Sequence, residues 1–305
     1  MNSKLTPPPH RFFAALLLAV SCAAFAQDTA QTPVTPPTPV ADETPAPTVP
    51  PIPYSGKIVS ATGTLPEKLS VFADCQDGRE RIQGKVDAGV YAIDLPPAIV
   101  CTITLGEQDW AADVQPVYDA RTALAQTMLV YPRAVPQPDI AGELIEMGAQ
   151  DRAQRQAWAG GQRDAAFQKK MAADERKRQR RLRQIVTTKG WPTISMVGAE
   201  AANEAWLLAQ HAPPAQLKHW VIFMRAAANQ HQIKLANLAS SLDRVRMYEK
   251  RPQIYGSQYT VEKDGAIQIY PIEDFANVDQ RRLEMGMPTL ADYQAQLAQA
   301  AQPKN

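Results

Sequence analysis

The first part of the chain alternates short apolar runs with turn residues. Runs such as KIVSATG, LSVFADC, VYAIDL and IVCTITL are rich in β-branched and aromatic residues, and Gly, Pro and Asp-Gly signals separate them. Such runs are typical of β-strands. Short strands at this spacing predict a small β-sandwich over residues 55–133.

The pattern changes to helical spacing from Ile140. This spacing continues to about Thr187, and Gly160-Gly161 interrupts it. Further along, Leu235, Leu238, Leu242 and Val245 recur at intervals of three or four, which places them on one face of a helix. Three more helices are predicted here, over AEAANEAWLLAQHA, AQLKHWVIFMRAAANQHQ and KLANLASSLDRVRMY.

A β-hairpin is predicted after these helices. PQIYGSQYTVE and AIQIYPI are joined through Lys263-Asp264-Gly265, and Asp-Gly between two such runs favours a tight turn. Two short helices complete the chain. The predicted fold is therefore multidomain, with a small N-terminal β-sandwich followed by a mainly helical α+β domain over residues 139–300 that carries one hairpin.

The N-terminus has the pattern of an export signal over residues 1–26. Basic residues precede an apolar run that is too short to span a bilayer, and Ala24-Phe25-Ala26 fits a cleavage site. Lipidation of Cys22 is the alternative. Residues 27–54 are rich in Pro, Thr, Ala and Val, which predicts an extended linker, either a plain spacer or a docking peptide. The sequence thus predicts a periplasmic or secreted protein, cleaved after Ala26.

The charge balance argues against nucleic acid as a partner. Cleavage would remove two of the 32 basic residues and none of the 31 acidic ones, taking the net charge from +1 to −1. The two cysteines that would remain, Cys75 and Cys101, are expected to pair in an oxidising compartment, and two separate buried thiols are the alternative.

A basic run lies in the predicted helix, between Lys169 and Arg183. It allows two interpretations. It is either a peripheral contact for an anionic surface such as lipid headgroups, or a solvated helix face whose acidic neighbours Asp174 and Glu175 offset part of the charge.

The C-terminal half contains, in this order, the motifs ELIEMGAQDRAQR, GWPTISMVG, AWLLAQHA, LDRVRM, PQIYGSQY, PIED and VDQRRLEMGMP. Together these motifs resemble an uncharacterised bacterial family, domain of unknown function 6624. The resemblance implies a fold and motif positions, and it implies no activity. The basic run departs from the family's more mixed helix. Residues 55–133 show a weaker resemblance to carboxypeptidase-regulatory-like or prealbumin-like β-sandwiches.

Polar residues within these motifs form the candidate site. Gln253 and Tyr255 share one face of a strand, and a bulge at Gly256 would turn Gln258 to the same face. These side chains, with Gln210, are predicted to line a polar cleft. His211 is the candidate acid or base, because its ordinary pKa lies near neutrality. Asp243 is the candidate orienter of the imidazole, and Arg244 the candidate anion clamp.

Three functions stay open at this point. The first is an envelope protein that binds a small polar ligand, a glycan, a peptide or a wall fragment. The second is a hydrolase with His211 as general base, for which no Gly-x-Ser-x-Gly nucleophile is present. The third is a structural partner of envelope proteins. No cofactor is predicted, and His219 and His231 lack acidic partners at the spacing of a metal site.

Overall fold

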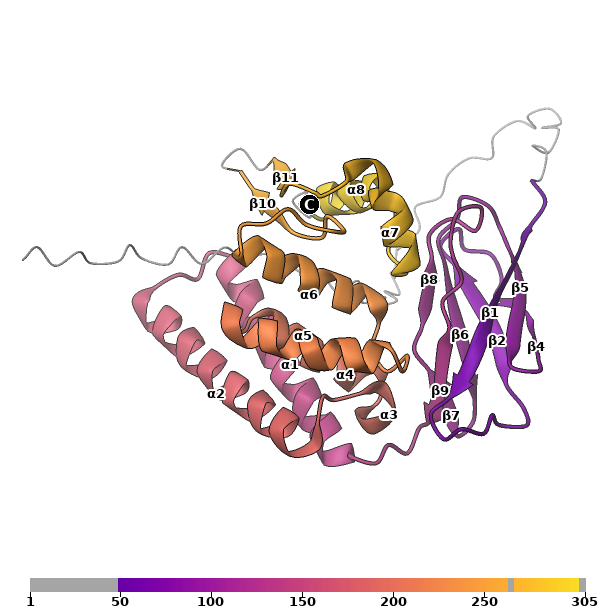
Figure 1. Cartoon of the computed structure of the whole chain (residues 1–305), viewed down its shortest axis with the longest axis horizontal. Coiled ribbons are helices and arrows are strands. Elements are labelled where there is room, and N and C mark those ends of the chain that lie inside the picture. The colour runs from indigo at the N-terminus through magenta and orange to yellow at the C-terminus, as the bar shows by residue number, and fades with distance from the viewer. Residues whose placement is uncertain (1–48, 263–265, 302–305) are drawn as a thin grey trace, which may run out of the picture.

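The computed structural model describes residues 49–262 and 266–301, and it has a strand-rich region followed by a helical region (Figure 1). The predicted signal, Cys22 and most of the predicted linker lie outside the described residues, as does the Lys263-Asp264-Gly265 turn. No helix within the described part is long and apolar enough to cross a membrane.

The strand-rich region precedes residue 138. Its first strand begins at Ile52, inside the segment predicted as linker, because Ile52 and Tyr54 pair with the strand that ends at Leu95. The strands described here are β1 (Ile52–Ser60), β2 (Ser70–Cys75), β3 (Ile82–Gln83), β4 (Lys85–Asp87), β5 (Val90–Leu95), β6 (Cys101–Glu107), β7 (Trp110–Ala112), β8 (Gln115–Val117) and β9 (Met128–Pro132).

These strands form one hydrogen-bonded path in the order β3-β2-β6-β7-β9-β1-β5-β4, with β8 beside β6. The predicted sandwich implies two separate sheets, whereas the path here curls until its two ends meet. β3 and β4 are consecutive in the chain and flank Gly84, whose N–H donates to Val71 O on β2 at 3.0 Å. A Cβ at Gly84 would lie 2.4 Å from Ala92 O on β5, so only glycine fits between the two strands.

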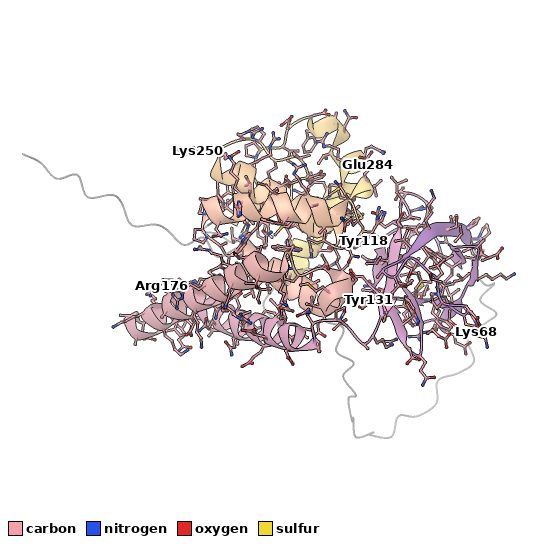
Figure 2. All side chains as sticks on the ribbon, turned by 60° about the horizontal axis from the view of Figure 1, so that its bottom comes forward. Lys68, Tyr118, Tyr131, Arg176, Lys250 and Glu284 are labelled. Atoms are coloured by element: carbon pink, nitrogen blue, oxygen red, sulfur yellow. A yellow bond between two sulfur atoms is a disulfide. The ribbon has the colours of Figure 1, made fainter. Side chains whose placement is uncertain are left out.

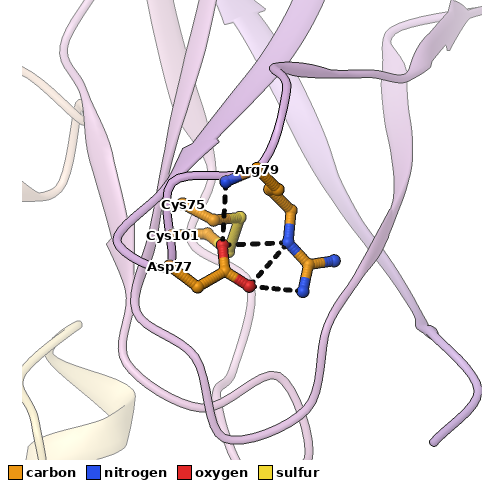
Figure 3. Close-up of a disulfide and its surroundings, with 4 residues drawn as sticks. All are labelled: Cys75, Asp77, Arg79 and Cys101. Carbon is orange, nitrogen blue, oxygen red and sulfur yellow. Dashed lines mark hydrogen bonds and ion pairs between the residues drawn. A yellow bond between two sulfur atoms is a disulfide. The ribbon is translucent and has the colours of Figure 1, made fainter. Parts of the chain in front are cut away.

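Alternation along the strands builds the core of the curled sheet. Tyr91, Ile93 and Leu95 on β5 are buried, and the residues between them are exposed. Cys75 and Cys101 occupy paired positions on β2 and β6 and form a disulfide, next to the Asp77–Arg79 ion pair (Figure 3).

The helical region begins at Pro138, whose fixed φ and missing N–H suit the first turn of a helix. Its first two helices are separated at Gly160-Gly161, as the sequence predicted. The helices described here are α1 (Pro138–Ala159), α2 (Ala165–Lys189), α3 (Ile194–Val197), α4 (Ala199–Gln210), α5 (Pro214–Ala228), α6 (Leu235–Tyr248), α7 (Val278–Glu284) and α8 (Leu290–Ala301), with a short 3-10 turn η1 (Phe275–Asn277) before α7.

Helix α4 lies at the centre of this region and contacts α1, α2, α3, α5 and α6. It is rich in alanine and almost entirely buried, so that neighbouring helices approach it closely. Two three-residue antiparallel strands, β10 (Tyr259–Val261) and β11 (Ile267–Ile269), pair within the segments predicted as a hairpin. Residues 252–258, predicted as strand, form a loop whose one bridge is Gln253 with Ile272.

The two regions touch each other. Leu129 and Tyr131 of β9 are part of the core of the helical region, and Tyr131 Oη accepts a hydrogen bond from Ala199 N at 3.1 Å. Lys234 Nζ lies 3.2 Å from Asp113 Oδ1 across the same boundary. Tyr118 and Tyr131 lie on the side of the sheet that faces the helices (Figure 2).

Candidate functional site

His211 lies at the end of α4, against a carboxylate from α1. Two prolines follow it, and they stop α4 and start α5. Imidazole Nδ1 is 2.9 Å from Asp151 Oδ2, and the two side chains are 7% and 0% exposed. This is an ion-pair distance whose angles do not make a hydrogen bond, so Nδ1 is buried beside the carboxylate without a hydrogen-bond partner among the described residues, and Nε2 faces away from Asp151. Among the described residues, none forms a hydrogen bond with Nε2.

Two arginines and a second carboxylate complete the surroundings of Asp151. Arg155 Nε lies 2.9 Å from Asp151 Oδ2, and Arg178 Nη2 lies 3.1 Å from Asp151 Oδ1. Both guanidiniums also reach Glu175 Oε2, at 3.2 Å from Arg155 and 3.4 Å from Arg178. We call Asp151, Arg155, Glu175, Arg178 and His211 the His211 cluster. Its two carboxylates and two guanidiniums balance, so a neutral imidazole leaves the cluster without net charge.

Burial controls protonation in the His211 cluster. It lowers the pKa of His211 to about 4, partly opposed by the nearby Asp151 carboxylate, so the imidazole is neutral at pH 7. Burial raises the pKa of Asp151, but His211 and Arg155 outweigh it and hold that pKa well below the usual range. Burial also raises the pKa of Glu175. The result is a buried, uncharged imidazole beside a carboxylate, and its Nε2 can accept a proton or a hydrogen bond.

The cluster also contains a donor set of the kind that binds metals. One ligand atom each from Asp151, Glu175 and His211 lies within 4.8 Å of the others. Asp151 and Glu175 are both already paired with Arg155 and Arg178, whose positive charges repel a cation placed between them. The arrangement therefore disfavours a divalent ion, and we assign no metal to it.

Asp243 lies in a second, separate network. Its carboxylate is completely buried and accepts N–H bonds from Ile254 at 2.7 Å, Tyr255 at 3.1 Å and Ser257 at 2.9 Å, and the Ser257 hydroxyl at 2.8 Å. The sequence predicts Asp243 beside His211, whereas the structure places Asp151 there. The physical reason is that every side of the Asp243 carboxylate is used by the backbone of the loop.

The predicted glutamines bind one another rather than lining a cleft. Gln258 N donates to Gln253 Oε1 at 2.6 Å, and Gln253 Nε2 donates to Gln258 O at 2.9 Å and Tyr270 O at 3.0 Å. Gln253 and Gln258 are 0% and 4% exposed. Gly256 has φ +67°, and a Cβ there would lie 2.6 Å from Ile272 Cδ1. Gly256 therefore allows the tight turn that folds the two glutamines together, in a loop rather than in the predicted bulged strand.

Arg244 and Gln210 connect this network to α4. Arg244 donates to Gln258 Oε1 and to Gln210 O, both at 2.9 Å, and Gln210 Nε2 donates to Ser241 Oγ at 2.5 Å. We call Asp243, Arg244, Gln253, Ser257 and Gln258 the Asp243 network. Tyr255 is half-buried, and its backbone N–H and C=O bond to Asp243 and Arg282. Of the predicted site residues, only His211 belongs to the His211 cluster. The positive charge of Arg244 helps to lower the pKa of His211.

The sequence reasoning missed Asp151, Arg155, Glu175 and Arg178. A signal was present, because Leu144, Met147 and Asp151 follow one another at helical spacing and all three are buried. A carboxylate on an apolar stripe needs cationic partners to be buried. Arg155 is one turn further along α1, and Arg178 comes from α2.

Comparison with known proteins gives a family without an activity. Residues 138–304, more than half of the chain, match the model of a family of unknown function (DUF6624). The chain therefore belongs to this family, as the motifs predicted. No curated protein matches the chain, and no solved structure matches it. The resemblance of residues 55–133 to small β-sandwich modules stays a prediction.

Proposed function

We propose that the protein is exported and that its helical region binds a small polar ligand at the His211 cluster. The observation that carries the proposal is the buried imidazole, whose Nδ1 lies 2.9 Å from Asp151 Oδ2 and whose Nε2 makes no hydrogen bond with the described residues. A neutral imidazole offers an acceptor for a hydroxyl or amide N–H. Arg155, whose side chain is 29% exposed, adds a positive charge beside it.

These groups favour a ligand that carries hydroxyl or amide donors together with a carboxylate. Arg155 uses Nε and Nη2 within the cluster, and Nη1 has no partner among the described residues. A carboxylate beside Nη1 would gain a charge-assisted hydrogen bond. Fragments of the bacterial cell wall combine hydroxyls, amides and carboxylates in one molecule, so we propose a muropeptide as the ligand class.

Export rests on the N-terminal pattern and on the cysteines. The bond between Cys75 and Cys101 suits an oxidising compartment such as the periplasm. We propose that the strand-rich region, as a sandwich-like module, separates the helical region from the linker or contacts a partner protein. The lipidated form at Cys22 is the alternative mode of retention.

Titration calorimetry with purified muropeptides tests the binding proposal. Wild-type protein should bind, and His211→Gln should weaken binding at least tenfold because the Nε2 acceptor and its orientation are lost. His219→Gln is the matched control, since His219 is exposed on α5. Equal affinities for wild type and His211→Gln, or no binding by wild type, would reject the proposal.

A hydrolase is the second candidate, and the neutral state of the His211 imidazole at pH 7 allows it. A general base must be unprotonated at the working pH, and an imidazole with a pKa of about 4 meets this condition at pH 7. In the described part of the chain, no serine, threonine or cysteine contacts the imidazole, so the base would activate water. Mass spectrometry of incubated muropeptides would detect turnover that disappears in His211→Gln. Turnover that persists in this variant would exclude His211 as the base.

A further inference from the structure

Helix α2 has two faces of opposite character. Arg178, Leu182 and Ile185 are buried on the inner face, against α1 and α4. The outer face is exposed, and Arg176 on this face lies away from the strand-rich region (Figure 2). Five exposed basic residues, which we call the α2 ridge, lie on this side: Lys169, Arg176, Lys177, Arg180 and Arg183.

The α2 ridge is a single stripe. At about 100° per residue, Lys169, Arg176, Arg180 and Arg183 fall within about 60° of one another around the helix axis, and Lys177 lies beside them. The stripe runs for about 21 Å along the helix at 1.5 Å per residue. The ridge therefore runs along one exposed side of α2.

The acidic residues of α2 turn away from the ridge. Asp174 binds Lys170 and Gln154, and Glu175 belongs to the His211 cluster. None of the five ridge residues has an acidic partner within ion-pair distance in the part of the chain that the structure describes. The interpretation as a solvated helix face expects acidic neighbours to offset the basic charge. The ridge lacks this offset, because Asp174 and Glu175 pair with other residues.

We propose that the α2 ridge adsorbs to a bilayer leaflet that contains anionic phospholipid. Near such a surface each Lys or Arg raises the partition coefficient about fivefold, so five together convert a weak contact into stable adsorption. The ridge consists of basic side chains alone. Its attraction to the leaflet is therefore electrostatic, and salt weakens it. The chain as a whole carries a net charge of only +1, which is unlike a nucleic-acid binder.

Vesicle co-sedimentation of the chain without the predicted signal, residues 27–305, tests this proposal. The vesicles contain equal parts of phosphatidylglycerol and phosphatidylcholine, and pure phosphatidylcholine vesicles measure any binding that does not depend on charge. The test variant is Arg176→Glu/Arg180→Glu/Arg183→Glu. The control variant is Lys57→Glu/Lys68→Glu/Lys85→Glu, which changes the net charge equally at exposed positions of the strand-rich region.

The expected result is binding to anionic vesicles that raised salt abolishes. The ridge variant should lose at least 100-fold in partition coefficient, and the control variant should stay within about threefold of wild type. All six positions are exposed, and equal circular-dichroism melting curves would verify that both variants fold. An equal loss in both variants, or no loss in the ridge variant, would overturn the proposal. So would tighter ridge-dependent binding to lipopolysaccharide or duplex DNA than to the anionic vesicles.

Discussion

The Asp243 network and the His211 cluster each surround a carboxylate that has no exposed surface. Asp243 is held by backbone N–H groups of one loop, whereas Asp151 is held by side chains from α1, α2 and the end of α4. Backbone donors cannot leave without unfolding the loop. Side chains can move, and Arg155 is partly exposed. The comparison teaches that the partners of a buried carboxylate indicate its role. Backbone N–H partners indicate a structural role, and side-chain partners that can move indicate a candidate site.

Removing the Asp243 carboxylate should have the largest effect on stability. Asp243→Ala leaves three N–H groups, one buried and two part-buried, and a buried hydroxyl without their acceptor, so we expect the free energy of unfolding to fall by about 4 kcal/mol. Urea denaturation measures this change. Asp139→Ala, at an exposed position in the first turn of α1, is the control and should cost about 0.5 kcal/mol or less. A loss below about 1 kcal/mol in Asp243→Ala would show that the loop does not depend on this carboxylate.

Acidification should affect the His211 cluster next most strongly. The pKa of His211 is lowered to about 4 in the fold, and it is about 6.5 in the unfolded chain. The unfolded state therefore binds the proton first as the pH falls. The stability is fully present above about pH 6.5 and is lost progressively down to about pH 4, by about 3 kcal/mol in total. Urea denaturation of wild type and His211→Gln at several pH values measures the difference.

The comparison of wild type with His211→Gln is needed because other groups near the imidazole also titrate. Burial raises the pKa of Glu175, so protonation of that carboxyl stabilises the fold as the pH falls, with the opposite sign. The charge on Asp151 is lost only below the pH range in which the imidazole titrates, because the pKa of Asp151 is lowered. Parallel pH profiles for wild type and His211→Gln would show that the imidazole is not held neutral.

A methyl group at Gly256 should have an intermediate effect. Gly256→Ala would place Cβ at 2.6 Å from Ile272 Cδ1 and 3.1 Å from Leu290 Cδ1, at a φ of +67° that side chains disfavour. We expect a loss of about 2 kcal/mol by urea denaturation, from strain and overpacking together. Gly161→Ala has a similar positive φ with nothing within 4 Å, so it isolates the strain alone at about 1 kcal/mol. Equal losses in both variants would mean that the Asp243 network relaxes around the added methyl.

Hydrophobic periodicity was sufficient to predict the longer helices but not the four-residue α3. The predicted segments contain α4, α6 and all of α5 except Pro214, because Leu, Trp and Met at intervals of three and four share one face of a helix. It was not sufficient for the sheet. Closure depends on Gly84 fitting between β2 and β5, which are far apart in sequence, and no local pattern encodes such a contact.

Residue type predicted which positions of the helical region are polar and buried, but not which of them meet. His211 was recognised from its chemistry. Its partner was assigned to Asp243 because both lie in neighbouring motifs, whereas the fold brings Asp151 from 60 residues upstream. Alternating Gln253 and Tyr255 suggested an open strand face. The Gln253 amide instead bonds to the backbone of Gln258 and to Tyr270 O, which satisfies its buried polar atoms. The Gln258 amide bonds to Arg244 and Ser257.

The smallest effect on stability is expected from a substitution of Arg155. This substitution gives the sharpest test of the difference between the His211 cluster and the Asp243 network. Arg155→Gln removes a cation that is 29% exposed, so solvent screening limits the loss to about 1 kcal/mol. The charge of Arg155 also helps to lower the pKa of His211, so this pKa should rise above about 4 in the variant. An NMR titration of the imidazole measures the shift, and Lys218→Gln, which breaks an exposed ion pair on α5, is the control. A loss as large as that of Asp243→Ala would show that Arg155 is as fixed as the loop backbone, and the cluster would then have no partner to exchange for a ligand.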